Sequence, residues 1–83
     1  MTTRVTITYC ADCGYERETL ALVEALMREF GSRVAAIELI PWDGGAFDVR
    51  VGDDLVHSMA RDGGFPDTET VTAAVRRALA PRV

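Results

Sequence analysis

The sequence has no lysine, few cysteines and histidines, and no long hydrophobic run. Its nine cationic residues are all arginine and are outnumbered by thirteen carboxylates, so the net charge is −4. This balance argues against nucleic-acid binding, because contact with phosphates needs a basic surface. The longest apolar segment is too short to cross a bilayer, so we expect no membrane partner.

The first ten residues, MTTRVTITYC, lack the continuous apolar region of a signal peptide. We therefore expect a cytoplasmic protein, in which thiols stay reduced and a permanent structural disulfide is unusual. The two cysteines, Cys10 and Cys13, would also close only a very short loop, which constrains the unfolded chain little. A purely stabilising disulfide is thus a weak interpretation of this pair.

Hydrophobic periodicity predicts one domain over residues 1–83 with the order β-α-β-β-β-α. The expected elements are strands at 4–9, 34–40, 47–51 and 55–58 and helices at 16–30 and 67–79, with a Gly-rich loop at 61–66. Strands joined through a helix should be parallel, with a right-handed crossover. Clean alternation in the first and third strands implies that both helices cover one sheet face. The prediction is a two-layer α/β sandwich of thioredoxin-like type.

Each helix has an apolar stripe that we expect to face the sheet. In the first helix the stripe comprises Leu20, Val23, Met27 and Phe30, with Leu26 beside it. In the last helix, which Asp67 is expected to cap, it comprises Val71, Ala74, Val75, Ala78 and Leu79.

The segment CADC would lie between the end of the first strand and the start of the first helix. A helix N-terminus favours thiolate over thiol, and thiolate is the nucleophile in disulfide exchange. The spacing also lets the second thiol resolve a mixed disulfide formed by the first. In contrast, Asp12, Glu16 and Glu18 place negative charge nearby, so we expect a less acidic thiol and a poorer oxidant than strongly oxidising CxxC proteins.

Other interpretations of the pair remain open. A closed zinc site needs four ligands, whereas the two cysteines and the lone His57 supply at most three. Two thiolates suit Cu(I), although the chain lacks the final strand usual in small copper-carrying domains. The pair could also report redox state to a bound protein without turnover, or simply fill the core. Reversible dithiol chemistry is the favoured hypothesis, with no bound cofactor or metal.

Three segments, TYCADCGYE, GAFDVRVGDDLVHS and GGFPDTET, resemble the selenoprotein W-like (Rdx) family in order and spacing. The resemblance implies a thioredoxin-like fold and a cytosolic redox role, often linked to glutathione. Selenium-containing members have selenocysteine at the position of Cys13, so this chain resembles a cysteine-containing member. That match points to Cys13 as the reactive group, whereas thioredoxin-type enzymes attack with the first cysteine, Cys10. Both are therefore assigned catalytic roles jointly, with a client protein or glutathione as the mixed-disulfide partner.

Two aromatic residues should lie near the cysteine pair. The topology brings the loops containing Trp42 and Phe65 to the sheet edge where CADC lies. They would form an apolar docking rim for a partner or, equally well, cover the ends of the core. His57 is most simply a strand residue.

Overall fold

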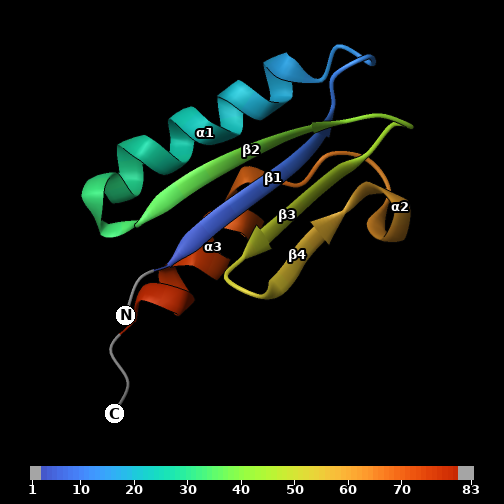
Figure 1. Cartoon of the computed structure of the whole chain (residues 1–83). Helices are drawn as coiled ribbons and strands as arrows, with labels where there is room; N and C mark the ends of the chain where they lie inside the picture. Colours follow the sequence, from blue (N-terminus) through green and yellow to red (C-terminus); the bar gives the residue numbers. More distant parts are fainter. Residues whose placement is uncertain (1–2, 81–83) are drawn as a thin grey trace.

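The computed structural model describes residues 3–80 and contains a four-stranded mixed sheet. Its strands are β1 (Arg4–Cys10), β2 (Ala36–Trp42), β3 (Phe47–Val51) and β4 (Asp54–Ser58), in the order β2-β1-β3-β4 (Figure 1). The central strand β1 is parallel to β2 and antiparallel to β3, and β3 forms a hairpin with β4. The predicted order of strands along the chain and the parallel pairing of β1 with β2 are confirmed.

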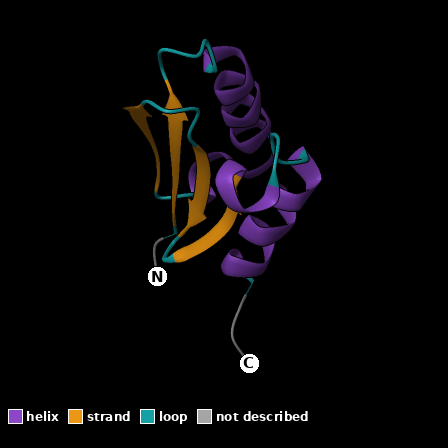
Figure 2. Cartoon of the chain, turned by 90° about the vertical axis from the view of Figure 1, so that its right-hand side faces the viewer, coloured by secondary structure: helices purple, strands orange, loops and turns teal. Residues whose placement is uncertain are grey.

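Helices α1 (Glu16–Phe30) and α3 (Thr68–Leu79) lie on the same side of the sheet, as Figure 2 shows. Helix α1 contacts β1, whereas α3 contacts β3 and β4. A 3-10 turn, η1 (Gly31–Arg33), follows α1, and a short helix, α2 (Met59–Asp62), follows β4. The two-layer α/β sandwich expected from the sequence is therefore correct.

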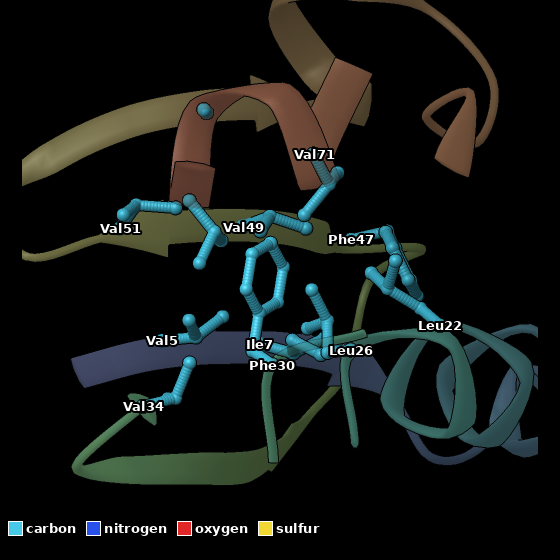
Figure 3. Close-up of a cluster of buried hydrophobic side chains, with 12 residues drawn as sticks. Val5, Ile7, Leu22, Leu26, Phe30, Val34, Phe47, Val49, Val51 and Val71 are labelled. Atoms are coloured by element: carbon cyan, nitrogen blue, oxygen red, sulfur yellow. The ribbon is translucent and has the colours of Figure 1, made fainter. Parts of the chain in front are cut away.

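The core fills the space between the sheet and the two long helices (Figure 3). Strands β1 and β3 supply alternate residues, because successive side chains of a strand point to opposite faces. The buried hydrophobic residues of these two strands and the helices are Val5, Ile7, Phe47, Val49, Val51, Leu22, Leu26, Phe30, Val71, Ala74 and Val75. Strand β1 therefore runs through the centre of the core and leads directly into the CADC segment.

The contact face of α1 differs from the predicted stripe. Thr19, Leu22, Leu26 and Phe30 are buried, whereas Leu20 and Met27 are 59% and 61% exposed. The helix carries two overlapping apolar stripes, and the polar Thr19 belongs to the buried one. Its hydroxyl donates to the carbonyl of Tyr15 at 2.9 Å, which removes the cost of burying it. In α3, Val71, Ala74 and Val75 are buried and Leu79 partly so, but Ala78 is exposed.

Several element boundaries and one cap also differ. Strand β1 extends one residue further than predicted, to Cys10, and β4 begins one residue earlier, at Asp54. Strand β2 begins after η1 and runs through Pro41, which an edge strand tolerates because a proline nitrogen can face outward. The region expected to be only loop begins with α2, whose N-cap Ser58 accepts from the Arg61 N–H. Asp67 occupies the N-cap of α3 as expected, but its backbone carbonyl, and not its side chain, accepts hydrogen bonds there.

Candidate functional site

The two cysteines lie at the C-terminal end of β1 and differ sharply in exposure. Cys10 is the last residue of the strand and is 0% exposed, whereas Cys13 lies in the following turn and is exposed. A disulfide joins them, with their Cα atoms 5.3 Å apart. One sulfur of the pair is thus enclosed by protein, and the other is open to a partner.

Backbone contacts hold the turn against the neighbouring strand. The Ala11 N–H donates to the Trp42 carbonyl at 3.0 Å, and Cys10 is in register with Trp42. Gly14 closes the turn with φ +76°, a conformation that residues with a Cβ rarely adopt. The second cysteine is therefore positioned by the end of β2 as well as by β1.

The turn that carries Cys13 precedes the helix, as the sequence predicted. Helix α1 begins at Glu16, so Cys13 lies before its first turn and not inside it. Glu16 and Glu18 occupy that first turn, where their carboxylates complement the positive end of the helix dipole. The helix therefore assists a thiolate at Cys13 less than a motif within the first helical turn would allow.

Tyr15 connects this turn to two distant segments, a role that the sequence did not reveal. Its ring makes edge-to-face contacts with Phe65 at 4.9 Å and with Phe47 at 6.5 Å between centroids. Phe47 and Phe65 are themselves 5.0 Å apart, which completes an aromatic cluster. The Tyr15 hydroxyl lies 3.8 Å from the sulfur of Met59. The sequence signal for this role was an aromatic residue two positions after Cys13.

The loop that carries Phe65 is anchored by His57. This histidine is 7% exposed, and its Nε2 lies 2.8 Å from the Gly64 carbonyl. Its Nδ1 lies 3.6 Å from the carboxylate of Asp62. Gly63 and Gly64 both have positive φ, which glycine adopts readily. His57 is a strand residue, as expected, and its contact with Gly64 holds the loop that carries Phe65.

Charge pairing stabilises α2 beside this loop. The Arg61 guanidinium donates to both carboxylate oxygens of Asp62, each at 2.8 Å. This hydrogen bonding, with a further bond from the Ser58 N–H, lowers the pKa of Asp62 to about 2. The same pairing raises the pKa of Arg61.

Trp42 and Phe65 flank the cysteine pair from different sides. Strand alternation puts Trp42 on the open sheet face with Glu38 and Ile40, and it is 62% exposed. Phe65 packs on the helix side and is 40% exposed. The two rings therefore do not form one continuous patch.

The described part of the chain shows neither a metal cluster nor a membrane span. Residues 3–80 contain no group of three or more His, Cys, Asp or Glu side chains that could hold a metal ion. No helix among these residues is long and apolar enough to cross a bilayer.

Comparison with known proteins identifies the relatives of this chain. The Rdx family model matches residues 4–77. Mouse (Mus musculus) selenoprotein W is 38% identical over 85 residues, covering 96% of this chain and 97% of that protein. Bovine (Bos taurus) migration and invasion enhancer 1 is 33% identical over 75 residues, covering 90% of this chain. The chain spans only 64% of the length of that protein.

A solved structure has the same fold. The selenoprotein W-related protein from Vibrio cholerae superimposes with a TM-score of 0.89, covering 96% of this chain and 100% of that one at 22% identity. The thioredoxin-like α/β arrangement is thus shared. With this fold, the matched residues 4–77 and the closed Cys10–Cys13 pair, the chain belongs to the Rdx family of thiol redox-related proteins.

Proposed function

We propose that the protein is a thiol-disulfide redox protein in which Cys13 attacks and Cys10 resolves. The observation that carries this assignment is the difference in exposure, because a client disulfide can reach Cys13 but not the enclosed Cys10. The disulfide between them supports the second step, since it places the two sulfurs within bonding reach. The order is opposite to that expected for a thioredoxin-type enzyme.

The cycle transfers two electrons from the dithiol to a client disulfide. The Cys13 thiolate attacks one client sulfur, forming a mixed disulfide and releasing the other client sulfur as a thiolate. The Cys10 thiolate then attacks the Cys13 sulfur, so the Cys10–Cys13 bond forms and the second client thiolate leaves. Both released thiolates take up protons from water. A cellular thiol reductant restores the dithiol, which suits a cytoplasmic location.

Local charge favours a protein disulfide over glutathione disulfide as the client. Asp12 and Glu16 are exposed beside Cys13, and the nearby cleft of about 150 Å³ has Glu18 in its wall and no cationic residue. The lining of this cleft is Glu18, Ala21, Leu22, Phe47, Phe65, Pro66 and Thr68. Carboxylates of a glutathione molecule would meet repulsion here. Trp42 and Phe65, one on each side of the pair, are the proposed apolar docking contacts.

The test is to trap clients with single-cysteine variants. Cys10→Ser keeps the attacking thiol and removes the resolving one, so it should accumulate mixed disulfides with client proteins. Cys13→Ser, the matched control, should accumulate few. Accumulation only with Cys13→Ser would reverse the assignment. Wild-type binding to the same clients without any disulfide reduction would instead indicate a redox-sensing adaptor.

A further inference from the structure

The two edge strands of the sheet differ in whether their outward backbone groups already have hydrogen-bond partners. At the β4 edge the Arg61 guanidinium donates to the carbonyls of Leu55 at 3.4 Å and Val56 at 3.2 Å. A register shift opposite Val49 and Arg50 leaves Val56 as the extra residue of β4, an irregularity that disfavours pairing with another strand. The β4 edge is therefore occupied by the protein's own arginine.

The β2 edge is open. The Trp42 carbonyl accepts from Ala11 of the β1 side, so strand alternation turns the N–H and carbonyl groups of Ile37 and Leu39 outward. The backbone of Pro41 points outward in the same way, so the N–H that proline lacks would not have bonded to β1. Within residues 3–80, no hydrogen bond from a side chain or loop reaches these outward groups. They repeat at every second residue, which is the spacing of an extended polypeptide.

An apolar surface lies beside this open edge. Glu29 of α1 pairs with Arg76 of α3, so the opposite flank of α1 faces away from α3. That flank carries Leu20, Val23 and Met27, which line a shallow groove of about 470 Å³ with Glu24 and Arg28. Helix α1 packs over β1 and α3 over β3 and β4, so this flank faces the β2 side of the sheet (Figure 1).

The open edge of β2 and the apolar flank of α1 meet at the border of the hydrophobic core. Val23 of α1 and Ile37 of β2 are both partly buried and pack against that core. Strand alternation also puts the Leu39 side chain on the helix side, where it is 39% exposed. We call the outer edge of β2 together with Leu20, Val23, Met27 and Leu39 the edge strip.

The chemistry of the edge strip indicates its occupant. Unpaired backbone groups along β2 are complemented by an extended peptide, which would add a fifth strand. Alternate side chains of that peptide would lie on the α1 flank, where apolar residues fit. Glu24 and Arg28 neutralise each other at 2.8 Å, so the groove attracts neither charge. At its C-terminal end β2 reaches Trp42, directly beside Cys10.

We propose that the edge strip binds an extended apolar segment of the client protein and presents the disulfide of that segment to Cys13. This inference rests on the proposed function, and it names the substrate class as disulfides in extended segments. The Cys13 thiolate forms a bond to the cysteine sulfur of the segment, and the partner sulfur leaves as a thiolate. Cys10 then closes the Cys10–Cys13 disulfide and releases the segment as a thiol.

The test compares three thionitrobenzoate mixed disulfides as probes of the reduced protein. One is carried by N-acetylcysteine, and the other two by alternating threonine–valine peptides with the cysteine at the N-terminal end in one and at the C-terminal end in the other. Release of thionitrobenzoate should be about tenfold faster or more from one of the two peptide probes, because strand pairing adds several hydrogen bonds. Only the cysteine position next to Trp42 should show the gain.

Two variants examine the edge strip itself. Leu39→Pro removes one outward N–H and should lower the ratio of peptide to small-probe rates by about three- to tenfold, the range for one lost hydrogen bond. Met27→Glu places a charge on the apolar flank and should lower the same ratio even if Leu39→Pro does not fold. Ala78→Glu makes the same charge change on an exposed position of α3 and should leave the ratio unaltered.

A serine version of the peptide separates docking from chemistry. It cannot react, yet it should shift and protect the amides of Ile37 and Leu39 in NMR spectra. If none of the three probes released thionitrobenzoate while these shifts appeared, the proposed redox function would fail and the docking site would stand. Equal rates for all three probes with no shifts would overturn the docking site alone. Amides of β2 already protected in a dimer without peptide would also overturn it, since a second copy would then occupy the edge.

Discussion

The ring of Tyr15 stands edge-on to the ring of Phe65, with centroids 4.9 Å apart. This contact connects the turn that carries Cys13 to a loop held by His57 through the Gly64 carbonyl. The surroundings of the cysteine pair thus depend on packing between segments far apart in the sequence.

Replacing Tyr15 should separate these segments. Tyr15→Ala loses two edge-to-face contacts of about 0.5–1.5 kcal/mol each in addition to its buried area, so the free energy of unfolding should fall by at least about 1–3 kcal/mol. Tyr15→Phe retains both edge-to-face contacts of the ring and loses only a weak hydroxyl–sulfur contact, so it should change the free energy of unfolding by less than about 0.5 kcal/mol. Urea denaturation measures both values, and equal losses in the two variants would show that the hydroxyl, not the ring, carries the contact.

The difference in exposure of the two thiols should appear in their reactivity. In the reduced protein, iodoacetamide should modify Cys13 first, because Cys10 has no exposed surface. Alkylation of Cys10 should be slower by about tenfold or more, since it requires local opening. Peptide mapping by mass spectrometry gives both rates, with urea-unfolded protein as the control in which they should converge. Faster labelling of Cys10 would contradict the assigned order of attack.

The buried face of α1 can be tested with neighbouring residues. Leu26→Ala removes a fully buried side chain and should lower the free energy of unfolding by about 2–5 kcal/mol. Met27→Ala, one position along, truncates an exposed side chain and should change it by no more than about 0.5 kcal/mol. Denaturant titration compares them directly. A larger loss of stability in Met27→Ala than in Leu26→Ala would instead support the buried face predicted from the sequence.

The ion pair of α2 should make stability depend on acid. Pairing with Arg61 lowers the pKa of Asp62 from 3.8 to about 2, so the folded state favours the carboxylate. The stabilisation is therefore fully present above about pH 4 and is lost as the pH falls towards 2. Asp62→Asn removes this titration, so the stability difference between wild type and variant should shrink over that window. Asp53→Asn, an exposed carboxylate in the β3–β4 turn, is the matched control. A difference that stayed constant from pH 5 to 2 would refute the role of the ion pair.

Much of the fold could be predicted because it rests on local patterns. Alternation in β1 and β3 and the change to helical periodicity after residue 15 were enough to predict the order of the strands and long helices. The short helix α2 was missed because it is only four residues long, its cap Ser58 was predicted as the end of a strand, and Asp62 was predicted to lie in a loop. Strand β2 was predicted two residues too early, at 34–40 instead of 36–42. A proline usually ends a strand, and only the position of β2 at the sheet edge shows that Pro41 can remain within it.

The sequence by itself determined that two cysteines lie between a first strand and a first helix, because spacing and periodicity are properties of the chain alone. Only the tertiary structure decided that Cys10 is enclosed and Cys13 is open, since burial depends on what packs from elsewhere. The same holds for α1, where two apolar stripes compete and the sheet selects one. The stripe left outside, with Leu20 and Met27, borders the edge on which the proposed client strand would pair.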